Sequence, residues 1–184
     1  EDIMELFSTL PQVGEIIGKG DKKTSVRLKN GMAADLRVVK PLEFPYALNH
    51  FTGSKEHNTV MRHIAKERGL KINEYGVFNT ETGERIPCKD EEDIYNIFDM
   101  EYISPELRED MGEIEAAQNG KLPKLVCESD IKGVLHIHSI YSDGVNTIEE
   151  LAEHARGLGY RYIGISDHSK SAYCANGHTE DDIY

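Results

Sequence analysis

The alternation of apolar and polar positions near the N-terminus predicts an antiparallel sheet of three strands. Apolar residues recur with period two in three short runs, and Asn30-Gly31 is a strong signal for a tight hairpin turn. The predicted strands are residues 13–17, 25–28 and 32–39, preceded by the end of an amphipathic helix with Ile3, Leu6, Phe7 and Leu10 on one side.

The third of these strands carries two charged residues on one face. Alternation places Ala34, Leu36 and Val38 on the buried face and leaves Asp35 and Arg37 together on the other. A carboxylate in the middle of a strand is uncommon. Asp35 is therefore either an ordinary solvent-facing residue or a candidate functional residue.

Helical periodicity follows the breaks at Pro41 and Pro45. A short helix at 46–51 and a tight turn lead to a longer helix, which Ser54 caps and Gly69 ends. The core-facing stripe of the longer helix is His57, Val60, Met61, Ile64 and Ala65. Beyond it the pattern predicts a small sheet at 70–72 and 75–78, a helix with an acidic first turn at 90–98, and short helices near 105 and at 112–118.

The last third of the chain predicts one strand, helix, strand unit after a linker at 121–132. Residues 134–138 alternate, Thr147 caps a helix that Gly159 ends, and residues 162–166 form the second strand. A right-handed crossover makes the two strands parallel, so their C-terminal ends meet at one edge.

Five side chains that can bind a metal are expected at that edge. His136 and His138 come from the first strand, Asp143 from the turn after it, and Asp167 and His168 follow the second strand. Imidazole and carboxylate together suit a hydrolytic metal such as Zn, Mn or Fe. The sequence therefore predicts a metal site here.

Composition is compatible with one medium or two small domains in 184 residues, of which 39% are hydrophobic. Cys88, Cys127 and Cys174 form no Cys-x-x-Cys pair and indicate reduced thiols, so we expect a cytoplasmic protein. No apolar run approaches the roughly 18 residues that span a bilayer.

Charge is distributed unevenly along the chain, although the net charge is -12. Residues 1–71 carry 12 Lys and Arg against 9 Asp and Glu, whereas residues 72–184 carry 9 against 24. Only the first part is suited electrostatically to a phosphate backbone. The same charges could equally serve only to solvate the surface.

Four motifs in this order resemble the bacterial family X DNA polymerases, relatives of repair polymerase beta. They are residues 20–28 (GDKKTSVRL), 34–39 (ADLRVV), 47–58 (ALNHFTGSKEHN) and 72–76 (INEYG). The stretch from Gly133 to His168 resembles the start of the polymerase and histidinol phosphatase (PHP) domain that such polymerases carry.

The resemblance implies roles in template-directed nucleotidyl transfer for the first part of the chain. Asp35 matches one of three palm carboxylates that hold catalytic Mg, with Arg37 two residues on. Asn58 matches a contact to the minor-groove edge of the incoming base, and Arg62 matches a template contact. The turn against the sugar of a deoxynucleoside triphosphate is matched by Phe51, Thr52, Gly53 and Ser54. Glu74 and Tyr75 match thumb residues that help to position Arg62. Gapped or primer-template DNA is the implied partner, in a protein without a membrane segment.

One position departs from the family pattern. The family usually has tyrosine where this chain has His50. The resemblance therefore does not define how the sugar of the nucleotide is selected.

For the PHP stretch, the resemblance implies that His136, His138, Asp143 and His168 are metal ligands, with Asp167 beside them. The implied reaction is metal-assisted phosphodiester hydrolysis, as in a 3′ to 5′ exonuclease or related phosphoesterase. The other histidines of this stretch, His154 and His178, are not expected to be ligands.

The expected fold is an α+β polymerase palm and thumb segment followed by the first βαβ unit of an incomplete, TIM-like α/β PHP barrel. The expected boundaries are 1–44 for part of the palm, 45–120 for the thumb, 121–132 for the linker and 133–184 for the start of the PHP domain. The family has further palm aspartates and further barrel ligands, so we expect this chain to be an internal fragment without a complete active site.

Three hypotheses remain open on the residues. The first is a family X repair polymerase with an appended PHP nuclease. The second is a metal-dependent phosphoesterase with a regulatory upstream module, and the third is a DNA-binding protein without catalytic activity.

Overall fold

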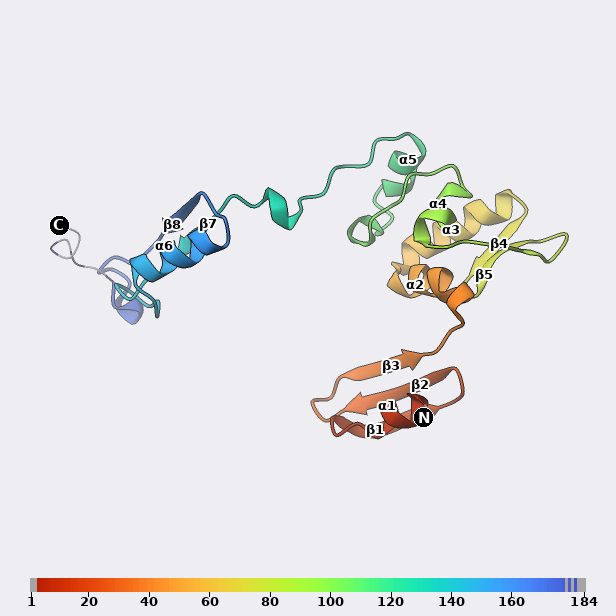
Figure 1. The fold of residues 1–184 in the computed structure, drawn as a ribbon, viewed down its shortest axis with the longest axis horizontal. Helices are drawn as coiled ribbons and strands as arrows, with labels where there is room; N and C mark the ends of the chain where they lie inside the picture. Colours follow the sequence, from red (N-terminus) through yellow and green to blue (C-terminus); the bar gives the residue numbers. More distant parts are fainter. Residues whose placement is uncertain (1–2, 178, 180, 182–184) are drawn as a thin grey trace. The chain divides into compact units, whose positions relative to one another are not determined.

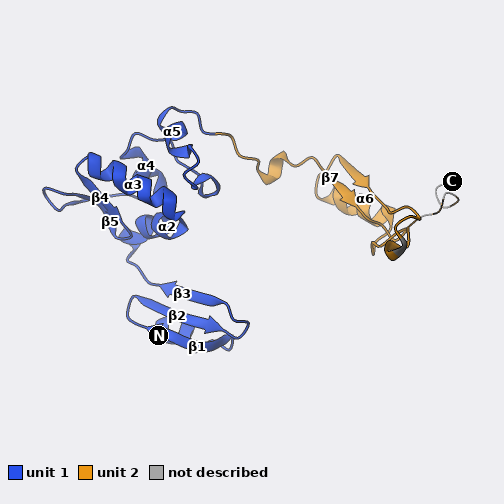
Figure 2. Cartoon of the chain, turned by 180° about the vertical axis from the view of Figure 1, so that it is seen from behind, with its two compact units in different colours: residues 1–122 blue, residues 123–184 orange. Residues whose placement is uncertain are grey.

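The computed structural model describes residues 3–177, 179 and 181. It divides into two compact units, Glu1–Leu122 and Pro123–Tyr184, which are coloured separately in Figure 2. None of the helices in the described part of the chain is both long and apolar enough to cross a membrane.

Unit 1 begins with the three-stranded antiparallel sheet that the alternation predicts (Figure 1). Helix α1, Ile3–Ser8, precedes strands β1, Val13–Lys19, β2, Lys23–Leu28, and β3, Ala33–Arg37. Strand β2 lies in the centre, and its Val26 is fully buried. The register pairs Asp35 with Ser25 and Arg37 with Lys23, so both charged residues of β3 face a polar neighbour.

One expectation for this region is wrong. Val38, predicted on the buried face of the third strand, is 39% exposed because β3 ends at Arg37 and regular alternation ends with it. Helix α1 buries Met4 and Ser8, whereas Ile3 and Leu6 are more than half exposed.

The rest of unit 1 packs helices on a second small antiparallel sheet. Its helices are α2, Phe44–Thr52, α3, Lys55–Glu67, α4, Glu91–Asn96, and α5, Glu113–Gln118, with short 3₁₀ turns at Pro41–Glu43 and Pro105–Leu107. Its strands are β4, Leu70–Asn73, β5, Gly76–Asn79, and β6, Arg85–Ile86, in that order. Ser54 caps α3, as predicted, and Asp90, expected within the acidic first turn of the next helix, is the N-cap of α4.

One apolar core holds these elements together. Met61 and Ala65 from α3 meet Val77 from β5 and Ile94 and Phe98 from the α4 region, and all five are almost fully buried. The helical stripe predicted for α3 is therefore confirmed, including His57, which is buried at the end of the stripe nearest Ser54.

Unit 2 is built around a parallel pair of strands. Strand β7, Gly133–Ile137, leads through helix α6, Ile148–Gly157, to strand β8, Tyr162–Ile165, with 3₁₀ turns at Glu128–Asp130 and Tyr173–Ala175. Thr147 and Glu150 form the predicted capping box of α6. The parallel pairing brings the C-terminal ends of both strands to one edge, as the crossover rule predicts.

Ile94→Ala tests the core. Ile94 has no exposed surface, so we expect truncation to lower the free energy of unfolding of unit 1 by about 2–5 kcal/mol. The matched control is Ile16→Ala, at a side chain that is 49% exposed, which should cost less than about 1 kcal/mol. Urea unfolding followed by circular dichroism measures both, and equal losses would contradict the assignment of the core.

Candidate nucleotide and metal sites

A pocket in unit 1 gathers six of the residues that the motifs single out. Its volume is about 390 Å³, and it lies at the junction between α2 and α3. It is lined by His50, Phe51, Thr52, Gly53, Ser54, Lys55, Asn58 and Arg62. The turn that the sequence predicts at 52–54 and the exposed side of α3 thus form one concave surface.

Backbone and side-chain hydrogen bonds fix the turn at the base of this pocket. Gly53 has a positive φ of 76°, a conformation that favours glycine. Ser54 Oγ accepts a hydrogen bond of 3.1 Å from the amide of His57, and the Ser54 carbonyl accepts one of 3.0 Å from the amide of Asn58. The Ser54 amide donates to the carbonyl of Arg108 at 2.8 Å. The turn is therefore tied to α3 and to a distant segment of the chain.

The charged residues of β3 lie in two different contacts. The Arg37 guanidinium lies 4.4 Å from the centre of the Phe51 ring, which joins the sheet to the pocket. Asp35 pairs with Lys23 at 2.7 Å. Hydrogen bonds from Lys23 and Ser25 lower the pKa of the Asp35 carboxyl, so this residue is an anion at neutral pH.

The polar side chains around the pocket have partners within the chain. Asn58 Nδ2 donates to the carbonyl of His50 at 2.8 Å, and Arg62 Nη2 donates to Thr59 Oγ1 at 3.3 Å. Tyr75, in the turn between β4 and β5, lies under Lys22, whose Nζ is 5.6 Å from the ring centre. Its neighbour Glu74 is half-buried. Neither Glu74 nor Tyr75 lines this pocket.

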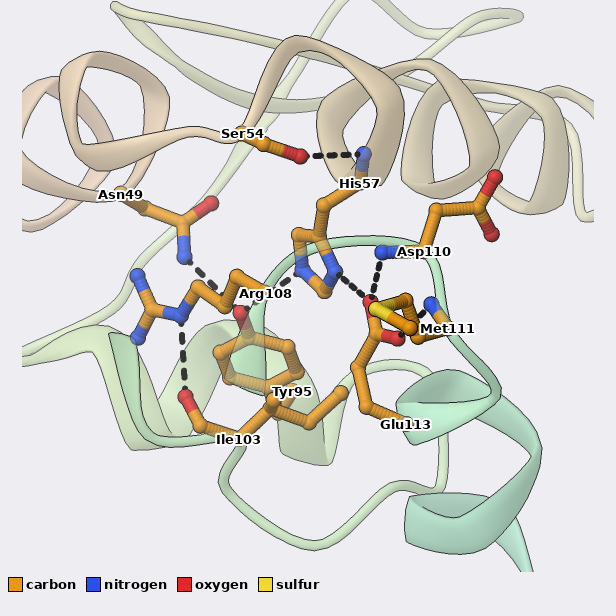
Figure 3. Close-up of polar contacts among 9 residues, drawn as sticks. All are labelled: Asn49, Ser54, His57, Tyr95, Ile103, Arg108, Asp110, Met111 and Glu113. Carbon is orange, nitrogen blue, oxygen red and sulfur yellow. Dashed lines mark hydrogen bonds and ion pairs between the residues drawn. The ribbon is translucent and has the colours of Figure 1, made fainter. Parts of the chain in front are cut away.

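A buried polar network lies next to the turn, and Figure 3 shows all of its members except Glu91. The members of the network are Asn49, His57, Glu91, Tyr95, Arg108 and Glu113, all less than 10% exposed. Most of the network has no signal in the sequence: the periodicity places His57 in the core but identifies no polar partner for it. Spacing could not identify the other members because their partners are 17 to 56 residues apart in the chain.

Unit 2 brings together three of the predicted metal ligands. His138, Asp143 and His168 each offer one ligand atom, and these atoms all lie within 4.8 Å of one another. His138 Nδ1 lies 2.9 Å from Asp143 Oδ1, and His168 Nε2 lies 3.6 Å from Asp143 Oδ2. His138 Nδ1 is buried but makes no properly directed hydrogen bond to any described residue. A buried nitrogen of this kind fits a ligand better than a structural donor.

The loop that carries Asp143 lies close to the backbone of the residues that follow β7. A Cβ at Gly144 would collide with the backbone of His138 and Ser139. The loop can therefore adopt this conformation only with glycine at position 144. Asp167 supports the same loop, since its carboxylate accepts hydrogen bonds of 2.7 and 2.6 Å from the Ser139 amide and hydroxyl and of 2.6 Å from the Ser142 hydroxyl. Asp167 thus holds the loop.

His136 lies beside the cluster but outside the group of three. Its ring centre is 5.1 Å from that of His138. The simple alternation expected for this strand is interrupted, because His136 has a positive φ of 63° and the pairing with β8 shifts register between Val134 and Ile137. His154 is exposed on α6, as expected, and His178 lies outside the described residues.

Comparisons with known proteins identify relatives of this chain. Residues 47–109 match the family model of the DNA polymerase beta thumb. The DNA polymerase/3′-5′ exonuclease PolX of Bacillus subtilis is 43% identical over 180 residues, which are 97% of this chain and 31% of that protein. Human DNA-directed DNA/RNA polymerase mu is 39% identical over 75 residues, which are 40% of this chain and 15% of that protein. The chain therefore spans less than a third of the length of these relatives.

Solved structures support the fold of unit 1. Leishmania infantum polymerase beta, in a ternary gap complex, superposes with a TM-score of 0.51 at 23% identity, covering 57% of this chain and 47% of that one. Unit 1 therefore has a polymerase beta-like palm and thumb fold of mixed helices and sheets. Together the matches confirm the resemblance to the bacterial family X DNA polymerases, and residues 47–109 match the polymerase beta thumb.

The buried His57 predicts a pH dependence. Burial lowers the pKa of its imidazole below 6.5, so the unfolded chain takes up a proton first as the pH falls. The stability that neutral His57 contributes is fully present above about pH 6.5 and is lost below it. Urea unfolding of unit 1, followed by the amide resonances of α3, should show a steeper loss from pH 7.5 to pH 5.5 in the wild type than in His57→Phe.

His63→Phe is the matched control, because His63 is an exposed histidine of the same helix. It should keep the wild-type pH dependence. If His57→Phe keeps it as well, His57 is not the group that titrates.

Proposed function

We propose that unit 1 serves a DNA polymerase as its thumb and the adjoining part of its palm, binding gapped or primer-template DNA and an incoming deoxynucleoside triphosphate. The observation that carries this proposal is the pocket in which Phe51, Asn58 and Arg62 come together over the 52–54 turn. The relatives supply the reaction class, since their names describe DNA polymerases.

Each residue around the pocket has chemistry that suits one part of the proposed substrates. The Phe51–Ser54 turn presents an apolar ring and backbone atoms, which suit the sugar of a nucleotide. The Asn58 amide can donate to minor-groove acceptors once it leaves the His50 carbonyl. Arg62 is exposed and suits a template phosphate or base edge, and Glu74 and Tyr75 lie in the neighbouring turn between β4 and β5.

Asp35 is the residue of this chain that is proposed to hold Mg. It is an exposed carboxylate, a hard oxygen ligand of the kind that Mg prefers, but it is paired with Lys23. Binding of the ion requires that Lys23 release it. Mg would supply electrostatic stabilisation of charge on the reacting phosphates.

For unit 2 we infer a metal-dependent phosphoesterase site of the PHP type, at the start of a TIM-like barrel. The proposed activity is that of a 3′-5′ exonuclease, which the name of the B. subtilis relative includes. His138, Asp143 and His168 fit a metal because two imidazoles and a carboxylate converge, and one of the nitrogens is buried without a hydrogen bond. His136 is the proposed fourth ligand. Mn, Zn or Fe bound there would supply Lewis-acid activation for hydrolysis.

DNA binding tests the first proposal. Arg62→Ala should weaken binding of the chain to DNA with a one-nucleotide gap by roughly three- to tenfold and reduce its salt dependence, because one cationic contact is lost. Fluorescence anisotropy at two salt concentrations measures both quantities. Arg85→Ala, with the same change of charge on β6, is the control and should bind as the wild type does. Equal affinities of all three proteins would contradict the assignment of the pocket.

Metal binding tests the second proposal. Titration with Mn or Zn should raise the melting temperature of the wild type, since an ion that binds only the folded state stabilises it. His138→Ala should abolish the shift, and His136→Ala should reduce it. The control His154→Ala should preserve it, because His154 is exposed on α6 away from the three ligands. A wild type that no metal stabilises would overturn the site.

A further inference from the structure

The segment from Arg108 to Glu113 closes a ring of hydrogen bonds with the turn of the nucleotide pocket. On one side, the Ser54 amide donates to the Arg108 carbonyl. On the other side, His57 donates its backbone amide to Ser54 Oγ and uses its ring Nδ1 to contact Glu113 Oε1 at 2.7 Å. The amide of Asp110 donates back to Glu113 at 2.9 Å and completes the ring (Figure 3).

The direction of every hydrogen bond around Glu113 follows from its partners. Its carboxylate accepts from two backbone amides, those of Asp110 at 2.9 Å and Met111 at 2.7 Å. A third contact, from His57 Nδ1, makes a set of donors that stabilises the ionised carboxylate. Nδ1 of His57 therefore carries the proton.

The other ring nitrogen of His57 is then fixed as an acceptor. Neutral imidazole with a proton on Nδ1 has a free lone pair on Nε2, which lies 3.1 Å from the Tyr95 hydroxyl. Tyr95 donates to this nitrogen, and its oxygen accepts from Asn49 Nδ2 at 3.3 Å. His57 thus links two halves of the network, and only its Nδ1 half belongs to the ring.

Burial makes the ring sensitive to the loss of one member. His57 has no exposed surface and Glu113 is 6% exposed. Removing one partner leaves a desolvated polar group without its hydrogen bond, which costs more than the bond itself contributes. The ring should therefore open as a unit when the contact between His57 and Glu113 is lost.

We propose that residues 108–113 are a strap that holds the Phe51–Ser54 turn in place, with Glu113 and His57 as positioning residues for the nucleotide pocket. The role in the pocket rests on the proposed function; the mechanical coupling does not. Glu113 lies outside the segment matched by the polymerase beta thumb, residues 47–109, so the strap adds to that thumb a support from α5.

Amide hydrogen exchange of the 184-residue chain, resolved by residue, tests the strap. Glu113→Gln removes the charge that the three donors share. It should accelerate exchange of the Ser54 and Asn58 amides by about tenfold or more, while the amide of Ile94 in the core keeps its rate within about threefold. The matched control is Glu115→Gln on the exposed side of α5, which should leave all three rates unchanged.

Two substitutions of His57 separate the strap from general support of the core. The side-chain amide of His57→Asn can replace Nδ1 as a donor to Glu113 and should keep the Ser54 amide protected. The amide of His57→Gln reaches the position of Nε2 instead and should leave the Ser54 amide exposed to exchange. Protection that is equal in these two variants, or exchange that rises equally at Ser54 and Ile94, would overturn the strap.

The experiment contains no DNA, so its outcome is independent of the proposed function. If Glu113→Gln loosens the turn although the chain fails to bind gapped DNA, the strap stands and the function of the pocket fails. If the chain binds DNA and Glu113→Gln leaves the Ser54 amide protected, the strap fails alone.

Discussion

The thumb of unit 1 depends on a buried arginine and the acceptors that surround it. Arg108 has no exposed surface; its Nη1 contacts Glu91 at 2.6 Å and its Nε donates to the Ile103 carbonyl at 2.9 Å. Its guanidinium also lies 5.4 and 5.5 Å from the ring centres of Tyr95 and Tyr102. A buried cation requires such compensation, because its desolvation costs several kcal/mol. This requirement draws α4 and the segment after it against the base of the pocket.

The same network connects the apolar core to the candidate nucleotide site. Glu91 accepts from Asn49 on α2 as well as from Arg108, and Asn49 leads through Tyr95 to His57 on α3. The backbone of Arg108 in turn holds Ser54. A substitution of Asn49, Glu91, Tyr95 or Arg108 would therefore change the shape of the pocket, although none of these residues lines it.

Much of the fold follows from local signals in the sequence. The Asn30-Gly31 turn, the caps Ser54 and Thr147, and the helical stripe of α3 all lie where the sequence predicts them. Local signals also bring the residues of the first pocket together, because Phe51 to Arg62 belong to one helix, turn, helix segment. The register shift at His136 could not be predicted, since it depends on pairing with a strand 26 residues away.

Long-range polar contacts account for the rest of what the sequence did not predict. The pair of His57 and Glu113 joins residues 56 positions apart, and the helical periodicity that places His57 in the core does not identify its partner. In unit 2, the resemblance groups Asp143 with the histidines, but nothing in the sequence indicates that Asp167 holds the loop. That role depends on the hydroxyls of Ser139 and Ser142, which both donate to Asp167 at 2.6 Å.

A map of amide chemical-shift changes on adding DNA with a one-nucleotide gap tests the central claim most directly. If unit 1 binds DNA with the face that contains the candidate pocket, the changes at saturation concentrate on residues 51–54, 58 and 62. Changes confined to unit 2, or none near the pocket at saturating DNA, would contradict the account.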